Sequence, residues 1–171
     1  EKMPRVNVPV RPFLFLNREE IEAARDISGK EEWAKNHKGN YIRTADIWLR
    51  RDYNFVKDII PPEGSIYTYG LGLNLDPVEH KKMIWRGWKD PRHVEAANGV
   101  VYPNESHKDA GSGWKDPVSG TTYYFIALAN GMTIKQLESV DLPALVNAFL
   151  LTGNVEYAGR ALWILDAIAS I

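Results

Sequence analysis

The sequence predicts a mainly α-helical protein with one long region of loops. Two observations lead to this prediction. Apolar residues recur at spacings of three and four within residues 17–60 and 121–171, which is the period of helices with a buried face. The residues between these regions, 61–120, are rich in Gly, Pro and Trp and lack that period. With 171 residues, the chain has the length of a single domain.

Residues 1–16 contain three prolines and are expected to form an extended strap. Asn17 and Glu20 then have the spacing of a capping box, which predicts that a short helix begins there and stops at Ser28-Gly29. A longer helix is expected over residues 30–51. Its predicted apolar face consists of Ala34, Tyr41, Ala45, Trp48 and Leu49.

Residues 61–120 are expected to be long loops. Within them, the five residues Gly-Trp-Lys-Asp-Pro occur twice, at 87–91 and at 113–117. Two copies are too few for a solenoid, for which three or more units are needed. A repeated turn that starts at the Asp-Pro pair is the simpler interpretation.

The last fifty residues are expected to be helical again. Residues 121–129 fit a strand or a buried helix, and helix is favoured. Asp141 is predicted to cap a helix with Pro143 in its first turn and Gly153 at its end. Asn154 is predicted to cap the next helix, and the short connection implies an antiparallel αα-hairpin.

The final helix is apolar around most of its circumference at residues 162–165, and neither Gly nor a basic residue follows it. Such a helix should be buried on more than one side. One hairpin and two shorter helices offer too little surface to cover it. We therefore expect the remainder of its own chain to be one partner of this segment.

Composition and charge exclude several classes of function. The formal net charge of -1 lacks the basic excess that nucleic-acid binding requires, so no nucleic-acid partner is expected. No apolar run has the length of a membrane helix, and no membrane partner is expected. The chain has no cysteine, and His80, His93 and His107 lack the close pairing of a zinc site. Neither a metal nor a cofactor is therefore expected.

Several segments resemble one family of enzymes. Residues 11–21, Arg-Pro-Phe-Leu-Phe-Leu-Asn-Arg-Glu-Glu-Ile, resemble the opening of heparinase II/III-like polysaccharide lyases. Further similarity follows in order along the chain. It covers the long helix that ends near Trp48, the Tyr102-Pro103-Asn104 turn, residues 109–114, residues 123–127 and residues 151–158. The resemblance implies that residues 1–171 are a single segment, the N-terminal part of an incomplete (α/α) toroid with long Gly/Pro/Trp-rich loops.

The resemblance also implies an activity, the β-elimination of a polysaccharide that contains uronic acid, in the periplasm or outside the cell. Such a reaction needs a donor that neutralises the uronate carboxylate and a Tyr or His that transfers the proton. In the family these groups lie beyond the hairpin, so no catalytic residue is expected here. The adjacent Asn36 and His37 lie between lysines in a helix and are expected to face solvent.

Substrate contacts are expected in the aromatic loops, where the implied partner is an acidic polysaccharide or oligosaccharide. Flat aromatic rings stack on sugars, and cations pair with uronate or sulfate oxygens. The expected substrate-binding residues are Trp85, Arg86, Trp88, His107, Trp114 and Tyr69. The tryptophans on helices, Trp33, Trp48 and Trp163, are expected to lie in the core instead.

Two other functions remain open from the sequence. One is a non-catalytic glycan-binding module, which would fold and bind without eliminating anything. The other is a glycoside hydrolase of the α/α-toroid type, in which Asp109 or Asp116 would act with a second carboxyl group from elsewhere. From the same glycan, the hydrolase would make a different product from that of the lyase, and the binding module would make none.

Overall fold

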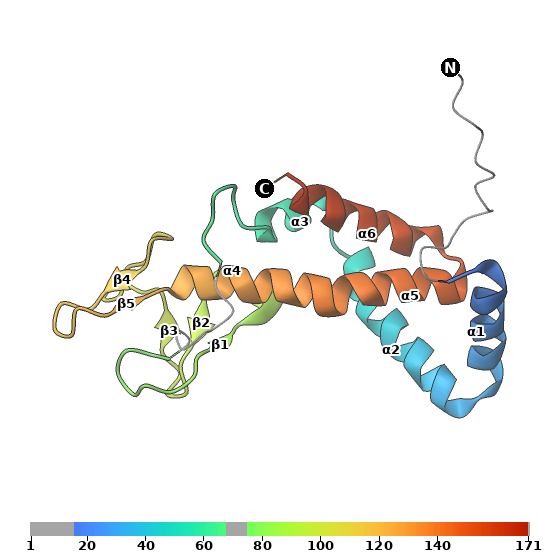
Figure 1. The fold of residues 1–171 in the computed structure, drawn as a ribbon, viewed down its shortest axis with the longest axis horizontal. Helices are drawn as coiled ribbons and strands as arrows, with labels where there is room; N and C mark the ends of the chain where they lie inside the picture. The colour runs from blue at the N-terminus through green and yellow to red at the C-terminus, as the bar shows by residue number, and fades with distance from the viewer. Residues whose placement is uncertain (1–15, 68–74, 171) are drawn as a thin grey trace, which may run out of the picture.

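The computed structural model describes residues 16–67 and 75–170. The expected strap, except for its last residue, and Tyr69 lie outside the described residues. The prediction of a mainly helical protein is confirmed (Figure 1). The helices are α1 (Arg18–Lys30), α2 (Glu32–Leu49), α3 (Tyr53–Ile59), α4 (Phe125–Gln136), α5 (Leu142–Thr152) and α6 (Val155–Ile168).

The first two helices follow the sequence closely. The Asn17 side chain accepts a hydrogen bond from the Glu20 amide at 2.8 Å, and the Glu20 carboxylate accepts one from the Asn17 amide at 2.7 Å, which confirms the capping box. In α2, Ala34, Ala45 and Trp48 are buried as predicted. Trp33 is 63% exposed, so the prediction that it lies in the core was wrong.

A continuous rod is formed by α4, a π-helical turn at Leu137–Asp141, and α5 (Figure 1). The prediction that Asp141 caps a new helix was wrong, because Asp141 has helical dihedral angles and is only 3% exposed. Its carboxylate accepts a hydrogen bond from the Trp48 indole at 2.9 Å and forms no cap bond with the first turn of α5. The π turn ends two residues before Pro143, whose missing N–H interrupts the regular helical ladder in any case.

The predicted αα-hairpin is confirmed. Helix α5 ends at Gly153, whose φ of 78° is left-handed, and Asn154 caps α6 by accepting a hydrogen bond from the Glu156 amide. The main core lies where α2, α3, α5 and α6 meet. On the outer side of α6, Leu162 and Leu165 are 64% and 50% exposed, so the described residues do not supply the expected cover.

The region expected to consist of loops contains short strands, so that prediction was wrong in part. A three-stranded antiparallel sheet runs in the order β1 (Ile84–Trp85), β2 (Val94–Glu95), β3 (Val101–Tyr102). A hairpin pairs β4 (Trp114–Lys115) with β5 (Thr122–Tyr123). Strands of two residues are too short for an alternating pattern to reveal them.

These strands lie beside the first half of α4, where a second core forms (Figure 1). Its buried members are Met83, Val94, Ala96, Tyr102, Phe125, Leu128 and Ala129. The predicted helix at residues 121–129 is confirmed only from Phe125 onward, because β5 occupies Thr122–Tyr123.

The two Gly-Trp-Lys-Asp-Pro copies fold differently. Gly87–Lys89 form a 3₁₀ turn, and the Asp90 carboxylate contacts the side chains of Arg86 and His93. In the second copy, Trp114 and Lys115 form β4, and the Asp116 carboxylate accepts a hydrogen bond from the Val118 amide. The predicted turn at the Asp-Pro pair is confirmed in both copies, because the His93 amide donates to the Asp90 carbonyl at 3.3 Å and the Gly120 amide to the Asp116 carbonyl at 2.9 Å, but the Asp side chain accepts from the turn's backbone only in the second copy.

A different pair of segments shares one turn, namely residues 76–81 and 116–121, which both begin Asp-Pro-Val. In each, the Asp amide bonds the carbonyl five residues later, at 2.9 and 2.8 Å, and its carboxylate accepts from the two amides after Pro. The fifth position is left-handed in both, with a φ of 54° at His80 and 72° at Gly120. Glycine adopts this conformation without the cost that histidine incurs.

Replacing His80 with glycine is therefore expected to stabilise the protein by about 0.5–1 kcal/mol, because a left-handed residue with a Cβ is strained. Urea titration of the purified variant measures the change. Val78→Gly is the control, since Val78 is 64% exposed and outside the left-handed region, and it should destabilise by about 0.5–1 kcal/mol. Equal effects of the two variants would contradict the prediction.

Candidate functional site

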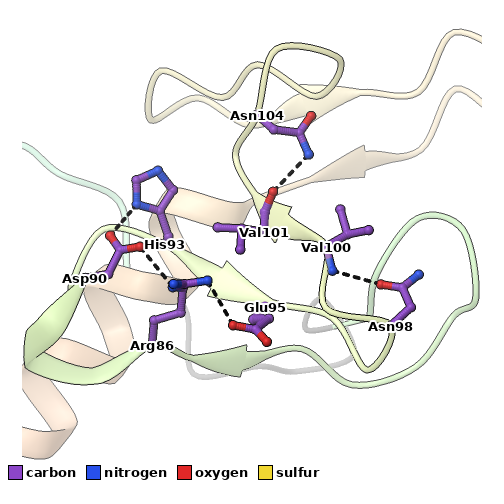
Figure 2. Close-up of polar contacts among 8 residues, drawn as sticks. All are labelled: Arg86, Asp90, His93, Glu95, Asn98, Val100, Val101 and Asn104. Carbon is purple, nitrogen blue, oxygen red and sulfur yellow. Dashed lines mark hydrogen bonds and ion pairs between the residues drawn. The ribbon is translucent and has the colours of Figure 1, made fainter.

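Arg86, one of the expected substrate-binding residues, is held between two acids (Figure 2). Its Nε lies 2.9 Å from Asp90 Oδ2, and its Nη1 lies 2.9 Å from Glu95 Oε2. His93 Nδ1 lies 2.6 Å from the other Asp90 oxygen. The charge of Arg86 is thus already matched by carboxylates of its own chain.

Trp85 and Trp88 connect the sheet to the helical core. The Trp85 indole donates a hydrogen bond to the Pro91 carbonyl at 3.0 Å, and its ring meets Trp88 edge to face at 4.9 Å. Trp88 packs in turn against Trp48 at 5.6 Å. Both loop tryptophans are only partly exposed, and each has a packing partner.

Trp114 packs against the second core, and His107 lies beside it. Their rings are 4.5 Å apart, and His107 also lies 5.1 Å from the ring of Tyr102. His107 Nδ1 lies 3.1 Å from Asn104 Oδ1. The structure therefore brings the expected residues together as two groups, Trp85 with Arg86 and Trp88, and His107 with Trp114.

A hollow of about 530 Å³, called here the central hollow, lies between two loops and the first turns of α4. The loop at 62–66, which rises between α3 and α4 in Figure 1, forms one wall, and the loop at 110–112 forms another. The lining residues are Pro62, Glu63, Gly64, Ser65, Ile66, Arg92, Ala110, Gly111, Ser112, Ile126 and Asn130. Of the expected substrate-binding residues that the structure describes, Trp85, Arg86, Trp88, His107 and Trp114, none lines it.

Arg92 is the cation of the central hollow, and hydrogen bonds fix its orientation. It donates to Asn130 Oδ1 at 3.0 Å and to the carbonyls of Asp58 at 3.1 Å and Ile60 at 2.8 Å. Asn130 is 2% exposed and donates to the Ile66 carbonyl at 3.2 Å. Burial lowers the pKa of Arg92, and nearby Tyr67 partly offsets this; the guanidinium still carries its charge at neutral pH.

The three acceptors that hold Arg92 are neutral oxygens. In the part of the chain that the structure describes, no ion pair involves Arg92, whereas Arg86 has two carboxylate partners. The acid among the lining residues is Glu63, which is exposed. Nη2 of Arg92 already donates to two carbonyls, so Arg92 offers an anion its charge and the remaining N–H groups on Nε and Nη1.

Asp109 fixes the second wall of the central hollow onto α4. Its Oδ1 accepts hydrogen bonds from the amides of Gly111 at 2.7 Å and Gly113 at 2.8 Å. Its Oδ2 accepts one from the Ile126 amide at 3.0 Å, in the first turn of α4. Gly113 has a φ of 88°, and a Cβ there would lie 2.7 Å from Thr122 Cγ2, so only glycine fits.

The central hollow was missed from the sequence because Arg92 and Asn130 are 38 residues apart and belong to no motif. One signal was available. Asn130 interrupts the apolar run 125–134, and a polar side chain on an otherwise buried helix needs a partner.

The chain matches no protein-family model, no curated protein and no solved structure. Among residues 16–67 and 75–170, no helix has both the length and the apolar character needed to cross a bilayer. The same residues contain no cluster of three or more His, Cys, Asp or Glu side chains that could hold a metal ion.

Proposed function

We propose that this chain is the N-terminal, (α/α)-toroid part of a polysaccharide lyase that cleaves uronic-acid-containing glycans by β-elimination, in the periplasm or outside the cell. In this proposal the central hollow binds one uronate residue. The observation that carries it is Arg92, a charged guanidinium fixed at the wall of the hollow by three neutral acceptors.

The chemistry of the central hollow suits an acidic sugar. A uronate carries one carboxylate, which the charge and the remaining N–H groups of Arg92 can bind, and several hydroxyls. Ser65, Ser112 and the backbone of the glycine-containing loops offer donors and acceptors for those hydroxyls. The volume of about 530 Å³ falls in the range of roughly 300–1,000 Å³ that is usual for small-molecule sites.

Neutralising the carboxylate is the first requirement of β-elimination, since it stabilises the negative charge that develops when the neighbouring C5 proton leaves. The second requirement is a group that removes that proton. The described residues that line the central hollow include no His, Tyr or Lys. The proposal therefore assigns uronate binding to this hollow and proton transfer to residues beyond 171.

Arg92→Gln tests the binding step by isothermal titration with glucuronate, galacturonate and, for comparison, neutral glucose. The substitution should weaken uronate binding by at least about tenfold, because a hydrogen bond to a charged group contributes about 1.5–3 kcal/mol. Arg50→Gln changes the net charge equally at an exposed position outside the hollow and should leave binding unchanged. Glu63→Gln should strengthen binding, because it removes the acid of the lining.

Two results would contradict the proposed site. One is that glucose binds as tightly as the uronates, and the other is that Arg92→Gln behaves like Arg50→Gln. Since Arg92 also holds three acceptors, the unfolding curve of each variant is recorded alongside. Elimination itself is measured with the longer enzyme of which, in this proposal, the chain is a part. The readout is the absorbance of the unsaturated uronate ends that elimination produces. Reducing ends without that absorbance would instead indicate a hydrolase.

A further inference from the structure

The central hollow has a neighbour on each side. A hollow of about 350 Å³ shares Ala110 with it, and one of about 190 Å³ shares Pro62 and Glu63 with it. The first is lined by Pro103, Asn104, Glu105, Lys108, Asp109 and Ala110. The second is lined by Lys57, Ile60, Pro61, Pro62, Glu63, Ala167 and Ser170.

The three hollows follow one another across the molecule. The 350 Å³ hollow lies in the loop between β3 and β4, the central hollow lies over the start of α4, and the 190 Å³ hollow lies where α3 and α6 end. In Figure 1 these elements succeed one another along the long axis of the molecule. We refer to the three adjoining hollows together as the groove.

Each hollow has a single basic residue in its lining, Lys108, Arg92 and Lys57 in order along the groove. The acids beside them are largely accounted for. Asp109 accepts hydrogen bonds from three backbone amides. Glu105 pairs with Lys108 at 3.1 Å, but their side chains are 96% and 74% exposed, and an ion pair this exposed is weak enough for Lys108 to exchange it for a ligand, unlike the half-buried pairs of Arg86. Glu63, between the central and the 190 Å³ hollows, is exposed.

We propose that the groove binds an internal stretch of an acidic polysaccharide, with one uronate at Arg92 and further acidic sugars near Lys57 and Lys108. This inference rests on the proposed function, because it extends the same site. In this proposal the sugars on either side of the central one occupy the two neighbouring hollows, which share lining residues with the central hollow. A site that recognises a chain end would be closed on one side, so the arrangement favours cleavage within the chain.

Galacturonate oligomers from the monomer to the hexamer test the length of the site, because they carry one carboxylate per sugar. Affinity, measured by isothermal titration, should rise at least about tenfold from monomer to trimer as each flanking hollow adds contacts. Lys57→Gln and Lys108→Gln should each weaken hexamer binding by about two- to fivefold, the usual size of an exposed charge interaction. Neither should change monomer binding.

Lys135→Gln is the matched control, since Lys135 is exposed and lines none of the three hollows, and it should bind every oligomer normally. A trimer that binds no tighter than the monomer would overturn the groove and leave uronate binding at Arg92 intact. Loss of hexamer affinity in Lys135→Gln equal to that in the two groove variants would also overturn it. If no oligomer binds, the monomer included, the proposed function fails as well.

Discussion

Trp48→Ala is expected to destabilise the protein by about 3–5 kcal/mol, the usual cost of removing a buried tryptophan. The Trp48 side chain is 1% exposed and contacts Phe55 at 6.2 Å and Trp88 at 5.6 Å between ring centroids. The Arg51 guanidinium lies 4.4 Å from its ring. The substitution would therefore leave a large cavity where helices and the loop tryptophans meet. Urea unfolding measures the change.

Trp33→Ala is the matched control, because Trp33 lies on the same helix but is 63% exposed. A surface substitution of this kind should change stability by less than about 0.5 kcal/mol. If the two alanine variants unfold at the same urea concentration, the described core is incorrect.

Trp48→Phe separates the packing of the ring from its hydrogen bond to Asp141. Burial raises the pKa of the Asp141 carboxyl, and the bond from the Trp48 indole acts in the opposite direction. Losing that bond raises the pKa of Asp141 in the folded state further. The folded state with an ionised Asp141 is therefore destabilised, and protonation of Asp141 at lower pH removes this cost. The cost of Trp48→Phe should therefore be greatest at pH 7 and shrink as the pH falls toward the unfolded carboxyl value of about 4.

Asp109→Ala is expected to cost about 2–4 kcal/mol, because it leaves three backbone amides without their acceptor at a position that is only 8% exposed. The loop at 110–112 would also lose its attachment to α4, and with it one wall of the central hollow. Uronate binding should weaken along with stability. Urea unfolding and isothermal titration of the same preparation measure the two effects.

Asp116→Ala provides the comparison for Asp109. The Asp116 carboxylate also accepts backbone hydrogen bonds, from Val118 and Ser119, but at an exposed turn where water can replace it. Its loss should cost about 0.5–1.5 kcal/mol and leave uronate binding unchanged. If the two substitutions lowered the free energy of unfolding equally, burial of the three amides that donate to Asp109 would not explain the cost of Asp109→Ala.

The features predicted correctly are those settled by residues close in sequence. The capping box of Asn17 and Glu20 spans three residues, and the end of α5 at Gly153 depends on one left-handed residue. The same limit explains the error at Asp141. An aspartate two residues before a proline has the pattern of a cap, but its hydrogen-bond donor is Trp48, 93 residues away. A local pattern contains no information about that partner.

The candidate site shows the same division. Tryptophans and cations in glycine-rich loops were expected to face a ligand, but Trp85, Trp88 and Arg86 have packing or ion-pair partners. Arg92 and Asn130, which line the central hollow, belong to segments that meet only in the folded chain.

The sequence by itself determined the helical class, the first helix cap and the closing αα-hairpin, because helical period and capping bonds are satisfied within a few residues. The tertiary structure decided that α4 and α5 form one rod, that the two Gly-Trp-Lys-Asp-Pro copies fold differently, and that Arg92 is held by neutral oxygens while Arg86 is held by carboxylates. The physical reason is that a buried polar group is stabilised by whichever distant segment supplies its partner, and only the folded chain brings those segments together.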